Sequence, residues 1–296
     1  MGEFILSCES TIDTSYEYVR QRDLPVLFYS YIVDERVYTD DLGRDEQSIP
    51  NFYKLLESGK MPRTTALNIE QYREFFEEQS AKGDLLHIAF GSGMSSSVNN
   101  AMIAADMVRE EHPERRIVVI DSLCSSSGYG LLVDGAADLR DAGRSFDETE
   151  AWVRESLGRI HHQFFSTTLE YFRRGGRVSG PMAAIGTVLN ICPIMHLDHT
   201  GSIIAYGKVR GKKAAMRTTV ETMEREALGG RDYAGPCWIS TSHCPEDAAV
   251  LAEMVCERFP NLRGKIKIWE IGVVIAAHTG PGTVAVFYMG DERQPD

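Results

Sequence analysis

The sequence predicts an α/β protein of two domains, an N-terminal three-layer α/β/α domain with a parallel sheet and a C-terminal two-layer α+β domain with a mixed sheet. In the first half, short apolar runs alternate with amphipathic segments, as in a parallel sheet covered by helices on both faces. In the second half, paired strand-like runs mix with helices. A chain of 296 residues is long enough for two ordinary domains. We place the boundary near residue 165, giving domains 1–165 and 166–296.

The first half supplies the elements of the parallel sheet. Strands are expected at residues 4–6, 26–29, 85–90 and 116–120. Helices are expected at residues 14–21, 49–58, 69–81, from about 98, and at 130–141 and 146–160. The segments 35–45 and 60–65 have the composition of turns and loops. Thr11, Ser95 and Ser122 follow predicted strands, and ligands of such sheets gather at the carboxyl ends of strands, so we expect one site there.

The second half predicts hairpins mixed with helices. Strands are expected at residues 191–195, 203–209, 238–242, 266–271 and 283–288. Helices are expected at residues 182–190, 217–226 and 246–259, and a tight basic turn at 173–177. This order of elements is typical of an α+β domain.

Composition and charge restrict the class of protein. The net charge of -12 argues against nonspecific nucleic-acid binding and against attraction to an anionic membrane. The six cysteines are scattered and form no C-x-x-C pair, which favours reduced thiols over a disulfide framework. The first ten residues lack the pattern of a signal peptide, and no apolar stretch is long enough for an integral membrane segment. We therefore expect a cytoplasmic protein.

A serine-rich turn at residues 91–97 lies between the predicted strand at 85–90 and a helix. Such a turn gathers hydroxyls, free backbone N–H groups and the positive end of a helix dipole, which suits a carboxylate or phosphate. The alternative is that the serines cap the helix. Sequence alone leaves both interpretations open.

No complete catalytic set is present. Ser92 and Ser95 lie outside any G-x-S-x-G elbow, although His278 could act as a base for either one. No phosphate-binding P-loop or dinucleotide-binding glycine motif exists. We interpret His161-His162 and His196…His199 as solvated loop histidines and predict neither a metal nor a cofactor. Basic islands in this acidic chain are solvated or recognise an acidic partner or phosphate: Arg173, Arg174, Arg177, Arg210, Lys212 and Lys213. Binding is favoured over catalysis.

Four segments together resemble the DegV family, the fatty-acid-binding proteins (FakB type) of bacterial fatty-acid kinase systems. They are P-R-T-T at 62–65, G-S-G-M-S-S-S at 91–97, R-G-G-R-V-S at 174–179 and A-H-T-G-P-G at 277–282. The segments resemble the family's P-K-T-S, S-S-G-L-S-G-T, R-G-G-R-I-S and A-H-x-G-P-G. Each is weak alone, but their order and spacing extend over nearly the whole chain.

The resemblance implies a long-chain fatty acid buried between or within the two domains. Thr64 and Ser95 match the family's two carboxylate-binding hydroxyls, and we include Thr65 and Ser92 beside them. His278 matches the histidine near the carboxylate, and Arg177 and Arg210 match arginines linked to kinase docking. The implied partner is a separate, ATP-binding fatty-acid kinase, so the carrier itself would need no ATP, metal or nucleic acid.

Some positions depart from the family pattern, and two other functions stay open. Gly91 and Ser96 exchange the usual Ser and Gly, Ala66-Leu67 replaces Gln-Pro, and Cys192 stands where Lys is common. The opening T-D-S-T motif is here C-E-S-T at residues 8–11. One alternative is a serine hydrolase that acts on acyl esters through Ser92 or Ser95 with His278. The other is a lipid-responsive interaction module without a kinase.

Overall fold

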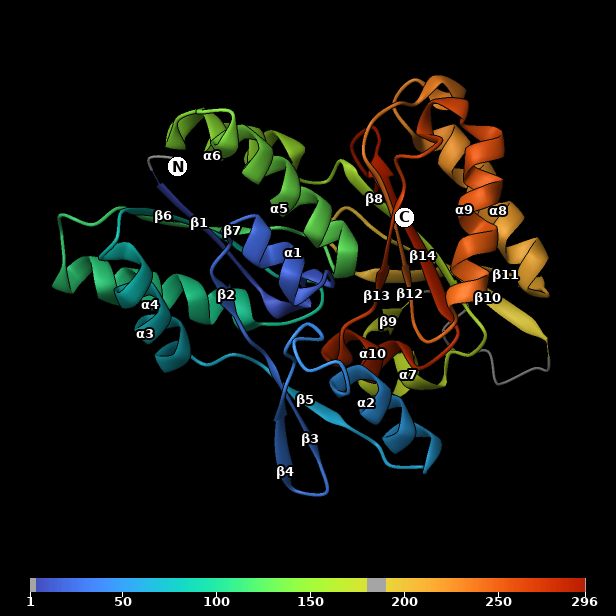
Figure 1. Ribbon diagram of the computed structural model, residues 1–296, viewed down its shortest axis with the longest axis horizontal. Coiled ribbons are helices and arrows are strands. Elements are labelled where there is room, and N and C mark those ends of the chain that lie inside the picture. Colours follow the sequence, from blue (N-terminus) through green and yellow to red (C-terminus); the bar gives the residue numbers. More distant parts are fainter. Residues whose placement is uncertain (1–3, 180–189, 296) are drawn as a thin grey trace.

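The first sheet of the molecule is parallel and is covered by helices on both faces (Figure 1). The computed structural model describes residues 4–179 and 190–295. Within them this sheet has the strand order β2-β1-β6-β7, with β1 (Phe4–Glu9), β2 (Val26–Leu27), β6 (Asp84–Ala89) and β7 (Ile117–Asp121). One face carries α3 (Ile69–Ser80) and α4 (Ser97–Glu111), and the other α5 (Ser126–Asp141) and α6 (Phe146–Ser156). The expected three-layer α/β/α fold is confirmed.

The second sheet is mixed, as predicted. In the described residues its seven strands have the order β13-β12-β14-β8-β10-β11-β9. Their bounds are β8 (Ile160–Ser166), β9 (Val178–Ser179), β10 (Ile191–Leu197), β11 (Ile203–Arg210), β12 (Cys237–Thr241), β13 (Lys267–Glu270) and β14 (Thr283–Met289). Helices α8 (Lys212–Glu226) and α9 (Pro245–Arg258) pack on the face turned away from the first domain. Helix α5 packs against β8, β12 and β14 on the other face.

Strands β8 and β14 are buried on both faces, and their alternation separates two cores. Phe164 and Phe287 belong to the core shared with α5, whereas Phe165 and Val286 belong to the core under α8 and α9. Successive side chains of a strand point to opposite faces, so one apolar run serves both cores. The face that α5 covers also lines a cavity.

Shorter elements line the seam between the two sheets. A small sheet with the order β4-β3-β5 projects from the N-terminal domain and contains β3 (Ser30–Val33), β4 (Arg36–Thr39) and β5 (Arg63–Thr65). The short helices are α1 (Tyr16–Gln21), α2 (Ser48–Glu57), α7 (Glu170–Gly175) and α10 (Val273–Thr279), with single 3-10 turns at Ser10–Ile12, Gly230–Asp232 and Pro260–Leu262. Helix α10 packs against α7, β3 and β5, and so it ties the C-terminal domain to the N-terminal one.

Several expectations need correction. Strand β5 occupies part of the expected loop at 60–65, β4 lies in the acidic segment 35–45, and α7 extends into the expected basic turn. Helix α5 begins at Ser126, before residue 130, and α10 was not predicted. The helix expected at 182–190 falls almost wholly outside the described residues. Strand β8, which contains the expected domain boundary near residue 165, pairs within the second sheet. The boundary itself stays a prediction.

The adjacent histidines of β8 are buried strand residues, not solvated loop residues as expected. His161 Nδ1 lies 2.9 Å from Glu226 Oε2, and its Nε2 lies 2.8 Å from the carbonyl oxygen of Asp291. In the described parts of the chain, no group of three or more His, Cys, Asp or Glu side chains is arranged to hold a metal ion. No helix of the described residues is both long and apolar enough to cross a bilayer.

Candidate ligand-binding site

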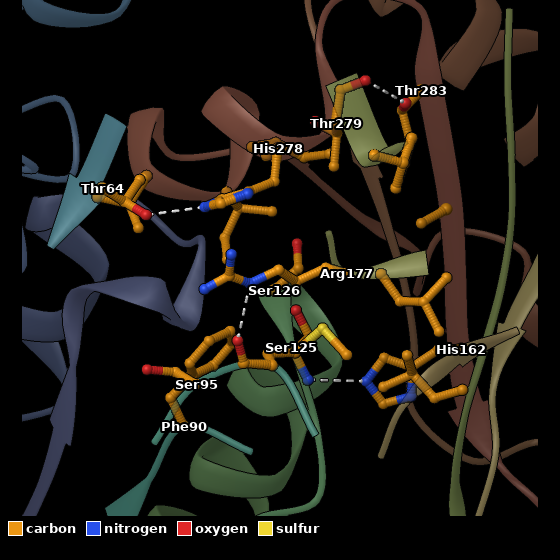
Figure 2. A pocket seen from close by; sticks show the side chains of 18 of the residues that line it. Thr64, Phe90, Ser95, Ser125, Ser126, His162, Arg177, His278, Thr279 and Thr283 are labelled. Carbon is orange, nitrogen blue, oxygen red and sulfur yellow. Dashed lines mark hydrogen bonds between the residues drawn. The ribbon is translucent and has the colours of Figure 1, made fainter. Parts of the chain in front are cut away.

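A cavity lies between the inner face of the second sheet and the segments that follow β5, β6 and β7 (Figure 2). Its lining is largely apolar and includes Phe90, Met94, Phe164, Phe172, Leu197, Ile203, Ile271, Val274, Ile275, Ala285 and Phe287. Its polar side chains gather at a few places and include Tyr29, Thr64, Thr65, Ser95, Arg177, Ser240 and His278. Apolar atoms supply most of the exposed lining, and hydroxyls and two histidines lie among them, which suits a largely apolar ligand that has a polar end.

Thr64 and His278 meet at one side of this cavity, although they come from different domains. Pairing of β5 with β3 fixes Thr64 opposite Tyr31, and α10 carries His278. The Thr64 Oγ1 atom lies 2.8 Å from His278 Nε2 (Figure 2). Burial, aided by the positive charge of Arg177, lowers the pKa of His278 to about 4. The ring is therefore neutral at neutral pH and offers a polar edge without a fixed charge.

Gly175 leaves the space that the His278 ring occupies. A Cβ atom at Gly175 would lie 2.3 Å from His278 Nδ1, which is closer than real contacts allow. The next residue, Gly176, ends α7 in the left-handed conformation with φ of 65°. The two glycines thus have different tasks, one providing space for the histidine and the other turning the chain.

Arg177 lies at the edge of the cavity and is exposed. Its Nε donates to the carbonyl oxygen of Met94 at 3.3 Å, and its Nη1 donates to the carbonyl oxygen of Gly175. The bond to Met94 connects the turn after α7 with the serine-rich turn of the first domain, and the bond to Gly175 lies within the turn itself. Arg210 is also exposed, at the end of β11, but it is not among the residues that line the cavity.

The serine-rich turn contributes both a helix start and a cavity wall. Ser95 Oγ accepts a hydrogen bond from the backbone N–H of Ser97 at 3.2 Å and lies 2.9 Å from Ser97 Oγ. Ser97 Oγ in turn accepts from the backbone N–H of Leu67 at 3.2 Å. Ser96 is the N-cap residue of α4 but makes no side-chain cap bond. Ser95 therefore satisfies one N–H group at the helix start and still lines the cavity.

Behind the serines lies a buried carboxylate that sequence reasoning did not assign to the site. Glu9 is fully buried and accepts hydrogen bonds from Tyr29 OH at 3.3 Å, from the backbone N–H of Phe90 at 3.0 Å and from Tyr72 OH. Tyr29 lines the cavity, as Ser95 does. Burial raises the pKa of Tyr29, so the phenol stays protonated and can donate to Glu9. The sequence signals were an acidic residue at the end of a buried strand and its position in the C-E-S-T segment at residues 8–11.

The structure brings together most, but not all, of the predicted site residues. Thr64, Thr65, Ser95, Arg177 and His278 all line the cavity. Ser92 does not line it: this residue is exposed, and its backbone N–H donates to Asp121 Oδ1 at 3.0 Å. Thr11 and Ser122, the other hydroxyls expected at the same site, are fully buried outside the cavity lining.

Comparisons of sequence give one family over almost the whole chain. Residues 6–291 match the family model described as "Uncharacterised protein, DegV family". A DegV domain-containing protein of Clostridium perfringens is 34% identical over 297 residues, covering 100% of both chains. A second such protein, from Lactococcus lactis, is 33% identical over 286 residues, or 96% of each chain.

Comparisons of structure give the same fold. A fatty-acid-binding DegV family protein from Thermus thermophilus has a TM-score of 0.85 at 24% identity, covering 98% of this chain and 100% of its own. The Streptococcus pneumoniae fatty acid kinase B3 protein, loaded with linoleic acid, has a TM-score of 0.82 at 21% identity, covering 97% of this chain and 99% of its own.

Proposed function

Because the chain belongs to the DegV family, we propose that it binds a long-chain fatty acid in the cavity between its domains and presents the carboxylate to a separate, ATP-binding fatty-acid kinase. The carboxylate lies at Thr64, Thr65, Ser95 and His278, and the acyl chain lies along the apolar walls. The protein acts as a cytoplasmic carrier without a cofactor of its own. The observation that carries the proposal is the apolar cavity with Thr64, His278 and Ser95 gathered at one side.

The apolar walls and the polar groups contribute differently to the stability of such a complex. Burying an acyl chain stabilises it by about 0.8 kcal/mol for each methylene group, which makes the apolar walls the main source of affinity. Hydroxyls and a neutral imidazole hold a carboxylate without the cost of burying a fixed positive charge. Arg177 at the edge attracts the anion from solvent while it stays hydrated itself. An acid held in this way keeps its carboxylate close to the surface where a kinase works.

Mass spectrometry of the organic extract of purified protein is the first test. We expect long-chain fatty acids at a near-equal molar ratio to the protein, and their absence would count heavily against a carrier. A fluorophosphonate probe addresses the alternative, a serine hydrolase. Stoichiometric labelling of Ser92 or Ser95 would contradict the carrier proposal.

The Thr64→Ala/Ser95→Ala variant tests the carboxylate site. We expect it to fold normally and to bind fatty acid at least tenfold more weakly, because each lost charge-assisted hydrogen bond costs about 1.5–3 kcal/mol. Fluorescence titration with a fatty acid gives the affinity, and the melting temperature reports the fold. Ser92→Ala is the matched control, because Ser92 belongs to the same turn but lies outside the cavity lining. Unchanged affinity in the double variant, with loss in the control, would move the carboxylate to Ser92.

Arg210 and Arg177 test the presentation to a kinase. Arg210 is exposed and lies outside the cavity lining, so Arg210→Ala should keep fatty-acid affinity and lower acyl-phosphate formation by the kinase. Adding Arg177→Ala should lower phosphoryl transfer further, and the effect should weaken as salt rises. If the melting temperature and both activities fall together, the arginines stabilise the fold and have no docking role.

A further inference from the structure

The floor of the cavity is a row of three side chains from three neighbouring strands. Ser240 of β12 pairs with Ala285 of β14, and Ala285 pairs with Phe164 of β8. All three residues line the cavity. Paired residues of neighbouring strands project from the same face of a sheet, so this row faces the ligand space together. Two members of the row are apolar, as a site for an acyl chain requires, and the third is a serine.

Ser240 is fully buried, and its Oγ atom has no hydrogen-bond partner among the described residues. Other buried hydroxyls of the lining do have partners. Thr283 Oγ1 donates to Ser166 Oγ at 2.9 Å, and Ser126 Oγ donates to the buried carboxylate of Asp13. Thr279 Oγ1 donates to the carbonyl oxygen of Gly280 at 3.3 Å. The hydroxyl of Ser240 thus lacks a partner among the described residues, in a side chain that belongs to the cavity lining.

His162, the ring in the adjacent row of the floor, is occupied. Its Nε2 accepts from the backbone N–H of Ser125 at 3.2 Å (Figure 2), and its Nδ1 lies 3.1 Å from the carbonyl oxygen of Ile160. Burial lowers the pKa of His162, which keeps the ring neutral in this arrangement. His162 therefore uses both ring nitrogens within the protein and leaves Ser240 unpaired.

A saturated acyl chain gives Ser240 no partner. A buried hydroxyl without a hydrogen bond is unfavourable, and an apolar residue at this position would avoid that cost. A ligand oxygen opposite Ser240 would form a hydrogen bond with the hydroxyl, so that neither polar group is buried without a partner. A site that offers a hydrogen bond to a ligand oxygen discriminates against the analogue without it.

We propose that Ser240 is a specificity residue for fatty acids that carry a hydroxyl or keto oxygen along the acyl chain. The proposal rests on the proposed function, because the carboxylate is held at Thr64, Ser95 and His278 while the chain crosses the floor of the second sheet. The oxygen-bearing carbon then lies against Ser240, between the flanking side chains of Ala285 and Phe164. Thr64, Ser95 and His278 thus select an acid, and Ser240 selects a chain that carries an oxygen.

The test compares stearic acid with a positional series of monohydroxystearic acids on the full-length protein. We expect one positional isomer to bind about tenfold more tightly than stearic acid, the size of a gained buried hydrogen bond. In Ser240→Ala this preference should fall to about twofold or less, while affinity for stearic acid is kept or improved. Ser240→Cys, which is slightly larger and bonds weakly, should lie between the two.

Thr219→Val is the matched control. Thr219 is also fully buried with an unpartnered Oγ1, but it belongs to α8 on the opposite side of the second sheet. Its removal should leave the preference unchanged. The inference is overturned if no isomer binds better than stearic acid, or if the preference survives in Ser240→Ala. Failure of every acid in the series to bind the wild-type protein would overturn the proposed function and this inference with it.

Discussion

The two ends of helix α10 are both buried at the seam between the domains, but they are stabilised in opposite ways. At the first end, Asp13 Oδ1 accepts from the backbone N–H of Gly272 at 3.0 Å, and the Asp40 carboxyl lies beside Gly272. At the other end, His278 contacts Thr64 and lines the cavity. Acidic residues of the N-terminal domain thus lie at the start of a seven-residue helix whose end lines the cavity.

The difference between the ends lies in what burial does to each group. Burial raises the pKa of Asp40 to about 7 and, with the neighbouring Asp40 carboxyl, raises that of Asp13. Burial lowers the pKa of His278 to about 4. In both cases burial favours the uncharged form, so the helix docks on the other domain with little buried charge. The first end packs inside the fold, and the second, in the proposed function, contacts the fatty-acid carboxylate.

Removing Asp13 should give the largest effect and should act on stability. Asp13→Ala leaves the Ser126 hydroxyl and the Gly272 N–H without their acceptor, and each unsatisfied buried group costs about 1–3 kcal/mol. We expect a loss of about 2–4 kcal/mol in the free energy of unfolding, measured by urea denaturation. Asp13→Asn keeps an acceptor and resembles the protonated acid, so it should cost clearly less. Equal losses in the two variants would show that the negative charge is what matters.

A pair of glycines tests the other end of the helix and should give an intermediate effect. In Gly175→Ala the new methyl group would displace the His278 ring, and we expect fatty-acid affinity to fall about tenfold. Gly176→Ala is the control, because a Cβ there meets nothing within 4 Å and only the positive φ is strained. It should cost about 1 kcal/mol of stability and leave affinity nearly unchanged. Equal affinities in the two variants would argue that the position of His278 is unimportant.

The sequence predicted the fold well because its periodicities are local. The buried runs of β6 and β7 and the amphipathic pattern of α3 report their own surroundings, and each was placed within a few residues. The same reasoning missed α10, because this helix is short and apolar on most sides and is held by carboxylates far away in the chain. It also missed the location of His161 and His162 in a buried strand.

The candidate site was predicted unevenly for a similar reason. Thr64, Ser95 and His278 belong to motifs that can be read along the chain, and the fold brings all three to one cavity. Tyr29 and Glu9 act through contacts between distant segments, which no local pattern reveals. Ser240 is inconspicuous in sequence and becomes informative only when pairing places it on the cavity floor without a partner. The roles of these residues stay predictions until the variants are measured.

The two ends of α10 should also differ in how the free energy of unfolding depends on pH. At neutral pH this is the smallest of the expected effects. The pKa of Asp40 rises from 3.8 to about 7 on folding, so its contribution is fully present below pH 3.8 and is lost as the pH rises through about 7. The pKa of His278 falls from 6.5 to about 4, so its contribution is present above pH 6.5 and is lost as the pH falls through about 4. The two groups therefore give slopes of opposite sign over the same range.

Asp40→Asn and His278→Gln should reveal these slopes when each is compared with the wild-type protein. Other buried acids, including Asp13 and Glu270, also have raised pKa values, so the difference between a variant and the wild type isolates one group, whereas the wild-type curve alone does not. As the pH rises from about 4 to 6.5, Asp40→Asn should gain stability relative to the wild type. The reason is that the wild type loses the stabilisation that comes from the proton on folded Asp40, and the variant has no such proton to lose. His278→Gln should lose stability relative to the wild type over the same rise in pH. The wild type gains stability there because its unfolded chain gives up the proton of His278 while the folded ring is already neutral. The variant lacks this gain. Urea denaturation at several pH values gives both difference curves. Parallel curves would mean that the two ends of the helix are not held by opposite titrations.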